Sequence, residues 1–153
     1  MKNMHLTELL ESRDIPLFSS EASLASLVQS IREGRQVRHF YLTAPGNHLV
    51  GIIPWRTLME YLLPGISLID RTLMPALAAS LNEVRAMDLV DESVPWLTLK
   101  NTLPEAMTTI LLSGYTALPV LDSRGRFAGE LALENILEVI PIENRKEAFH
   151  AVP

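Results

Sequence analysis

The side chains that could bind a metal or act as nucleophiles are few in this chain, and their spacing does not suit either task. No two of its four histidines are spaced as a pair of metal ligands on one helix; these are His5, His39, His48 and His150. The sequence contains no cysteine, which excludes disulfides, thiolate metal sites and cysteine nucleophiles together. We therefore expect no metal site.

The hydroxyl and carboxyl groups do not form a catalytic pattern either. Ser19, Ser20 and Ser23 lie close together, but no Gly-x-Ser-x-Gly turn surrounds them. A small hydrolase using Glu105 or Asp122 as its base is disfavoured, because these residues suit a first helical turn and the start of a tight turn. We expect that the chain is not an enzyme and requires no cofactor.

These residues belong to a sequence that repeats itself. The segment 15–59 reappears 79 residues later as the segment 94–137. The pairs at this offset are Ile15 with Val94, Pro16 with Pro95, Leu24 with Leu103, Ile31 with Ile110, Leu42 with Leu121 and Gly46 with Gly125. If the first copy has one extra residue near His48, the offset falls by one, and Gly51 then aligns with Gly129, Thr57 with Asn135 and Glu60 with Glu138. A duplicated unit usually buries one face against its twin, and a crevice between the two is a natural place for a ligand.

Each copy predicts the element order β-α-β-β-α. In the first copy we expect an extended stretch at 15–19, a helix between Ser23 and Gly34, a hairpin at 37–53 and a helix from Arg56. The corresponding parts of the second copy are 94–98, Thr102 to Gly114, 118–131 and a helix from Glu134. Prolines at 16 and 95 favour extended backbone, and the hydroxyls of Ser23 and Thr102 suit helix N-caps. Glu105 completes a capping box with Thr102.

Between the copies, an apolar stripe predicts a connecting helix that starts near Ser67, after Pro64-Gly65, and is perturbed at Pro75. The stripe consists of Leu68, Ile69, Leu73, Leu77 and Leu81. One interpretation is a spacer lying across the core, and another is a surface that docks on a partner chain.

Composition narrows the classes of partner. Of the 153 residues, 48% are hydrophobic and 20% are charged, and the mean hydropathy of +0.18 predicts apolar surface buried between chains, as in an oligomer. The net charge of −5 disfavours nucleic acid as a partner. Glycine and proline interrupt the longest uncharged run, so we expect no membrane span. Without an apolar N-terminal block, a cytoplasmic location is the default expectation.

With the repeat established, the chain resembles a tandem pair of CBS domains, also called a Bateman module. In the second copy the matching segments are Met87-Asp88-Leu89-Val90, Thr102-Leu103-Pro104-Glu105-Ala106, Leu118-Pro119-Val120-Leu121-Asp122, Gly125 and Gly129. The looser matches of the first copy are Leu6-Thr7-Glu8-Leu9-Leu10, Ala22-Ser23-Leu24, Phe40-Tyr41-Leu42-Thr43 and Gly51-Ile52-Ile53.

The resemblance implies an α/β fold of the α+β kind, in which two β-α-β-β-α units pack sheet to sheet about a pseudo-twofold axis and leave two clefts. It divides the chain into a first CBS motif (1–65), a connecting helical segment (66–83), a second CBS motif (84–142) and a C-terminal tail (143–153). It further implies a regulatory module that binds AMP, ATP or S-adenosylmethionine, forms a homodimer and acts on an effector protein in trans. The alternative is a dimerisation or interaction module that has lost nucleotide binding.

The resemblance also implies which residues line the clefts. They are Ile15, Pro16, Leu17, Pro54, Arg56, Thr57, Val94, Pro95, Trp96, Ala117, Leu118, Ala132, Glu134 and Asn135. Nucleotide-binding members have a Ser or Thr three residues after the glycine of the last strand, and an Asp six residues after it. Here Pro54 and Thr57 follow Gly51 at these positions, and Ala132 and Asn135 follow Gly129, so neither copy has both groups. Trp55 and Trp96 are expected either to pack in the core or to stack on a bound base.

Overall fold

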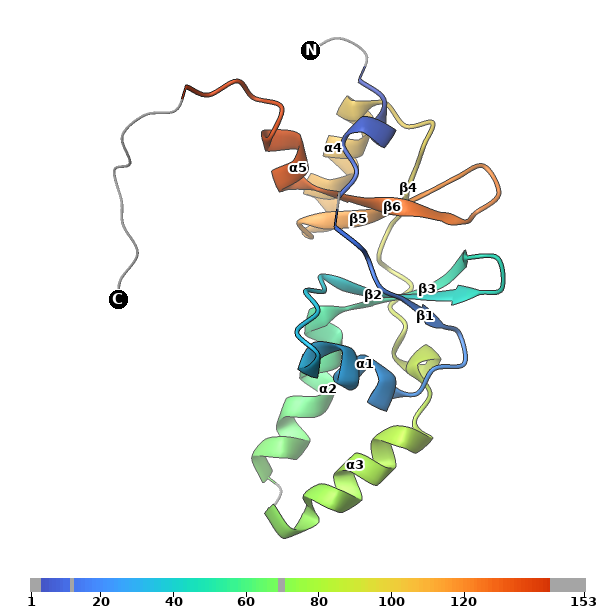
Figure 1. Ribbon diagram of the computed structural model, residues 1–153, viewed down its shortest axis with the longest axis vertical. Coiled ribbons are helices and arrows are strands. Elements are labelled where there is room, and N and C mark those ends of the chain that lie inside the picture. The colour runs from blue at the N-terminus through green and yellow to red at the C-terminus, as the bar shows by residue number, and fades with distance from the viewer. Residues whose placement is uncertain (1–3, 12, 69–70, 144–153) are drawn as a thin grey trace.

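The computed structural model describes residues 4–11, 13–68 and 71–143 (Figure 1). Most of the predicted C-terminal tail, together with His150 and Ile69, lies outside these ranges. The remaining expectations about the fold can be compared with the structure directly.

The structure confirms two successive β-α-β-β-α units (Figure 1). The first half consists of β1 (Leu17–Ser19), α1 (Leu24–Arg32), β2 (His39–Ala44), β3 (His48–Pro54) and α2 (Trp55–Leu68). The second half consists of β4 (Leu97–Thr98), α4 (Leu103–Ser113), β5 (Ala117–Leu121), β6 (Phe127–Ala132) and α5 (Leu133–Leu137). The halves are joined by the 3₁₀ turn η2 (Arg71–Leu73) and by α3 (Met74–Glu83), and the turns η1 (Leu6–Glu8) and η3 (Ala86–Leu89) precede β1 and β4.

Each half has one three-stranded sheet, in the order β1-β2-β3 or β4-β5-β6. The first strand runs parallel to the middle strand, and the hairpin pair is antiparallel. Figure 1 shows the two sheets stacked along the long axis, with both hairpin tips at the same end of the seam and with helices on the outer sides. This is the predicted packing of sheet on sheet.

The strand register corrects the predicted alignment of the two hairpins. Leu42 pairs with Gly51 and Val120 pairs with Gly129, so Leu42 corresponds to Val120 and not to Leu121. Asn47 (φ 64°) likewise shares the left-handed conformation of Gly125 (φ 77°). The one additional residue of the first copy therefore lies between the start of α1 and β2, because Leu24 and Leu103 are 79 residues apart whereas His39 and Ala117 are 78 apart, and not near His48.

The two N-caps are satisfied differently. Thr102 Oγ1 accepts a hydrogen bond from Glu105 N (3.2 Å), and Glu105 Oε1 accepts one from Thr102 N (2.8 Å), which confirms the capping box. The predicted side-chain cap at Ser23 is wrong. The amide of Leu24 donates instead to the carbonyl of Val84 (2.9 Å), so the chain entering the second half satisfies the first turn of α1.

The connecting helix also differs from its prediction. Helix α2 continues through Pro64 to Leu68, so the position near Ser67 where a new helix was predicted lies inside α2. The next helix, α3, begins at Met74 and has Pro75 in its first turn, where a proline needs no hydrogen-bond donor. Leu81 packs against the core of the first half, which supports the spacer interpretation for this end of the stripe.

The segments that precede β1 and β4 cross over to the opposite half. Leu6 and Leu9 belong to the core of the second half, and Ala86 belongs to the core of the first half. Glu11 N donates to the carbonyl of Glu130 (2.8 Å), and Asp91 N donates to that of Ile52 (2.9 Å). Each half therefore includes in its core a segment that leads into its twin.

The two glycines predicted to be related by symmetry meet these crossing segments in the same way. A Cβ atom on Gly51 would lie 2.5 Å from Val90 Cγ2, and one on Gly129 would lie 2.8 Å from Leu10 Cδ1. The hairpin tips also bond each other, through Leu49 N to Gly125 O (3.1 Å) and Phe127 N to Asn47 O (2.8 Å). These paired contacts are those of an approximate dyad between the halves.

Candidate functional site

A cavity of about 350 Å³ opens between the halves where the segment before β4 passes β3. It is lined by Leu49, Val50, Gly51, Ile52, Val90, Asp91, Glu92, Val94, Trp96 and Leu121. Val94 and Ile52 form a buried floor, whereas Val50 and Trp96 are 43% and 56% exposed. We call this space the Trp96 cavity. Its mainly apolar walls and its size suit the ring of a small molecule.

The ionisable groups among the residues that line the Trp96 cavity are both acidic. Asp91 Oδ1 accepts hydrogen bonds from Ser93 Oγ (2.6 Å) and Ser93 N (2.9 Å), and these bonds lower the pKa of Asp91 although burial opposes the shift. Arg56, which the resemblance places at a cleft, is bonded to Glu60 (2.8 Å) and is not among the residues that line the cavity. The cavity wall is therefore negatively charged at neutral pH.

Across the pseudo-dyad, the cavity residues Ile52 and Asp91 correspond to Glu130 and Glu11, which pair with the chain's own side chains. Glu130 is 1% exposed and replaces Ile52 in the repeat. Arg38 Nη1 lies 2.8 Å from Glu130 Oε1 and 3.6 Å from Glu11 Oε2, and Arg38 Nη2 contacts Glu134. Tyr41 Oη donates to Glu130 Oε2, and Arg13 Nη2 lies 3.8 Å from Glu130 Oε1. These residues form what we call the Arg38 cluster.

The Arg38 cluster alters the protonation of its members. Burial raises the pKa of Tyr41 well above its usual value, and the charge and hydrogen bond of Glu130 add to this effect. Although burial alone would raise the pKa of Glu11, hydrogen bonds from Arg13 N and Asn135, with the charges of Arg13 and Arg38, lower it.

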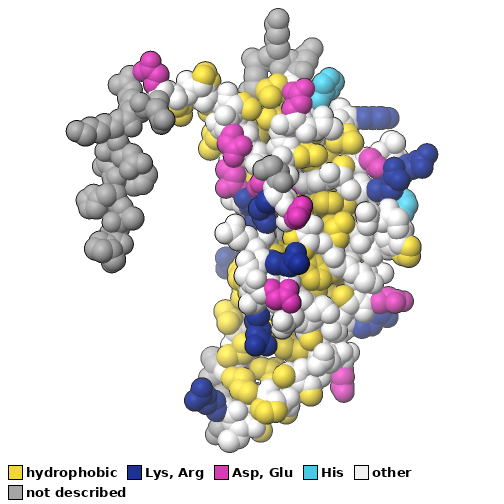
Figure 2. All heavy atoms as spheres, in the orientation of Figure 1, with side chains coloured by type: hydrophobic (Ala, Val, Ile, Leu, Met, Phe, Trp, Pro, Cys, Tyr) yellow, Lys and Arg dark blue, Asp and Glu magenta, His cyan; other side chains and the backbone are white. Residues whose placement is uncertain are grey.

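Figure 2 shows acidic and basic side chains following one another down the middle of one face. At this position of the seam, charge pairing replaces apolar packing.

His39 lies beside the cluster and is only 3% exposed. Its Nε2–H donates to the carbonyl of Ala117 (2.8 Å), and its ring contacts Tyr41 and Tyr115. Nδ1 is buried and has no hydrogen-bond partner among the described residues. Burial lowers the pKa of His39. The hydrogen bond to Ala117 and the charge of Glu130 act to raise this pKa, and the charge of Arg38 acts to lower it further. The imidazole is therefore held neutral.

The predicted site residues fall into separate places. Val94 and Trp96 line the Trp96 cavity, next to Pro95. Glu134 belongs to the Arg38 cluster. Asn135 is buried, accepts a hydrogen bond from Ala132 N (2.9 Å) and bonds Glu11, so its side chain is already engaged within the fold.

The other predicted residues have contacts within the fold. Leu118 is buried in the core, and Ala117 accepts the bond from His39. Pro54 pairs with His39 in the ladder, Ile15 packs on the core of the second half, and Thr57 is half-buried in α2. Trp55 stacks on Phe40 with ring centroids 6.3 Å apart, which supports the packing interpretation for this tryptophan.

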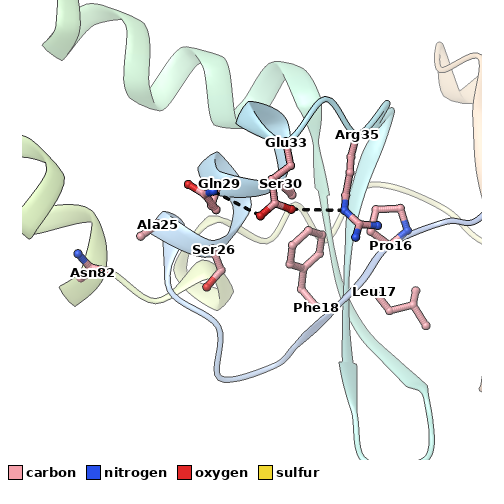
Figure 3. Close-up of a pocket in the computed structure, with 10 residues that line it drawn as sticks. All are labelled: Pro16, Leu17, Phe18, Ala25, Ser26, Gln29, Ser30, Glu33, Arg35 and Asn82. Atoms are coloured by element: carbon pink, nitrogen blue, oxygen red, sulfur yellow. Dashed lines mark hydrogen bonds and ion pairs between the residues drawn. The ribbon is translucent and has the colours of Figure 1, made fainter.

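Pro16 and Leu17 lie at a second space, an open groove of about 740 Å³ between β1 and α1 (Figure 3). Figure 3 shows Glu33 between Gln29 and Arg35, and the distances are 3.3 Å to Gln29 Nε2 and 3.8 Å to Arg35 Nε. Three of the polar side chains of this groove, Gln29, Glu33 and Arg35, therefore interact with one another. The groove is built from the first half and α3, so it differs from a cleft between the halves.

Sequence reasoning missed Arg38, Tyr41 and Glu130, as well as the acidic wall formed by Asp91 and Glu92. One signal was present, because Glu130 is a charged residue in an apolar strand at the position that Ile52 has in the first copy. Nothing comparable marks Arg38. Among the described residues, no cluster of His, Asp and Glu is arranged to hold a metal ion, and no helix is both long and apolar enough to cross a membrane.

Comparison with known proteins supports the fold. The family model for the CBS domain matches residues 86–142, and among curated proteins none matches the sequence. CbpB, solved in complex with c-di-AMP, is similar over 90% of this chain and 84% of its own (TM-score 0.67, 19% identity). CBSX2, solved in complex with AMP, is similar over 88% of this chain and 93% of its own (TM-score 0.67, 16% identity). A CBS domain pair/ACT domain protein from Thermotoga maritima is similar over 90% of this chain and 96% of its own (TM-score 0.63, 17% identity).

We predict that Arg38→Met destabilises the protein by about 3–5 kcal/mol, because it leaves the buried carboxylate of Glu130 without its main partner. The matched change Arg35→Met removes an exposed pair with Glu33 and should cost at most about 1 kcal/mol. Urea unfolding of the three proteins measures both effects. Equal losses in the two variants would contradict a stabilising role for the Arg38 cluster.

We further predict that stability falls as pH decreases from about 7.5 to about 5.5, a range above the titration of most carboxyl groups. The pKa of His39 is lower in the folded protein than in the unfolded chain. Its contribution to the free energy of unfolding is therefore present above about pH 6.5 and is lost as pH falls through the folded pKa. His39→Gln keeps a donor for Ala117 but does not titrate, so it should flatten this dependence. Urea unfolding at several pH values provides the test, and an unchanged slope in the variant would assign the dependence to other groups.

Proposed function

Because residues 86–142 form a CBS domain and the whole chain has the fold of a CBS-domain pair, we propose that the protein is a non-catalytic regulatory module. It binds an adenosine-containing ligand between its halves and acts in the cytoplasm on a partner protein in trans. The complexes of CbpB with c-di-AMP and of CBSX2 with AMP support a ligand of this class. Fold alone does not define function, so the proposal depends on the site.

The observation that carries the proposal is the exposed indole of Trp96 at a cavity on the seam. A core tryptophan would be covered, whereas this ring is more than half exposed beside apolar walls formed by Val50 and Val94. An adenine ring stacked on the indole would cover this apolar surface. The site is next to the segment that crosses between the halves, so an occupied cavity could favour one arrangement of the halves over another.

The exposed apolar side chains of the outer helices favour a second copy of the chain as a partner. Each half exposes apolar side chains on its helices, so two copies related by a twofold axis could cover both sets at once. The set on α2 comprises Tyr61, Leu63 and Ile66, and the set on and after α4 and α5 comprises Leu111, Leu112, Leu137, Ile140 and Ile142. We propose a homodimer through these helices.

One observation favours the alternative of an interaction module without a ligand. Glu130, the counterpart of the cavity residue Ile52, is paired with Arg38, and Asn135 caps its own helix, so neither side chain of the second half is free for a ligand. If the cavity also takes no ligand, the CBS-pair scaffold would serve dimerisation and partner binding alone.

Thermal unfolding with adenosine, AMP, ATP and S-adenosylmethionine at millimolar concentration tests ligand binding. A ligand at about 100 times its Kd should add roughly 2.7 kcal/mol of stability and raise the Tm. Trp96→Ala should abolish this shift, whereas Leu73→Ala, which removes an exposed apolar side chain outside the cavity and the proposed dimer interface, should retain it. The absence of a shift with every compound would favour the interaction module.

Leu112→Lys, which places a charge at an 84% exposed apolar position, should convert a dimer to monomers at micromolar concentration. Ser123→Lys adds the same charge at the β5–β6 hairpin, away from the helices, and should leave the dimer intact. Sedimentation equilibrium distinguishes the two species. A monomeric wild-type chain, or dissociation by both variants, would refute the proposed interface.

A further inference from the structure

Building on the proposed ligand site, we propose that the Trp96 cavity selects an aromatic ligand whose short substituent carries a positive charge and rejects one whose substituent carries a phosphate. The fold does not determine the charge of the ligand. That charge depends on which ionisable groups the chain places at the cavity and which it holds elsewhere.

The shape of the cavity limits the ligand to one ring system and a short substituent. About 350 Å³ lies at the lower end of the range for small-molecule pockets. Among the residues that line the cavity, the exposed apolar ones are Val50 and Trp96. Ile52 of β3 and Val94, which precedes β4, are buried. A flat ring can therefore cover the indole, and its substituent must lie close to the wall that carries Asp91 and Glu92.

That wall favours a cation. The two hydrogen bonds from Ser93 to Oδ1 of Asp91 fix the carboxylate and keep it ionised. Glu92 adds a second carboxylate to the lining. The face of an indole attracts positive charge as well, so the aromatic and acidic residues of the cavity act in the same direction.

Two arginines at the last helix of each half, Arg56 and Arg38, are engaged with carboxylates away from the cavity. Arg56 is 87% exposed in its side chain and bonded to Glu60. Arg38 is surrounded by Glu11, Glu130 and Glu134 on the other side of the pseudo-dyad. None of the described residues that line the Trp96 cavity is a lysine or an arginine. A phosphate would therefore lie beside two carboxylates without a counterion, at a Coulombic cost.

Three compounds with the same ring and sugar test the inference. At neutral pH 5′-amino-5′-deoxyadenosine is a cation, adenosine is neutral, and AMP carries about two negative charges. Calorimetric titration of the full chain should give the tightest Kd for the amine and the weakest for AMP. At least about a tenfold difference is expected between these two compounds, which corresponds to one modest charge interaction near a protein surface.

The variant Asp91→Asn with Glu92→Gln removes both charges, while the new amide oxygen at position 91 can still accept the bonds from Ser93. It should reduce the preference for the amine over AMP to about threefold or less. The pair Glu83→Gln and Glu138→Gln removes the same net charge from exposed helical positions and should preserve the preference.

The outcomes separate this inference from the proposed function. If AMP binds most tightly, or if the cavity variant leaves the order and the ratio unchanged, the charge preference is refuted while ligand binding stands. If none of the three compounds binds at millimolar concentration, both proposals are wrong for adenosine-type ligands.

Discussion

The structure depends on two crossing segments, each packed on the last strand of the opposite half. Gly51 and Gly129 permit this packing because a side chain on either would collide with Val90 or Leu10. The backbone bonds of Glu11 to Glu130 and of Asp91 to Ile52 then fix each segment against the strand it crosses. Since each half has its core completed by a segment leading into the other, the halves form one cooperative unit, and each would be marginal if it stood alone.

The duplicated halves differ in chemistry at corresponding positions of the seam where they meet. At one position of the seam, Ile52 lines the Trp96 cavity beside the exposed tryptophan. At the related position, Glu130 interacts with Arg38, Tyr41 and Arg13. A buried carboxylate is tolerated only with such partners, because it loses hydration on burial. The change of one residue in a repeated strand therefore brings with it a set of charged neighbours, and the pseudo-twofold axis relates two sites of unlike chemistry.

Local patterns predicted most of the fold from the sequence. The capping box at Thr102 and the turn residues around Gly125 depend on neighbours within four positions, so spacing alone identifies them. Ser23 was mispredicted because Val84, sixty-one residues away, satisfies the helix instead. The site was predicted less well for the same reason. Arg38 and Glu130 are 92 residues apart, and only the packing of one sheet on the other brings them together.

Helix α3 has no counterpart in the second half, since α5 is followed by no described helix. It lies beside α1 at one extreme of the molecule, so the two ends of the pseudosymmetric chain present different surfaces (Figure 1). Two copies aligned in the same direction would bring their α3 helices to a common end, whereas copies aligned in opposite directions would place α3 next to α4. This helix thus gives the molecule a polarity that the repeat by itself lacks.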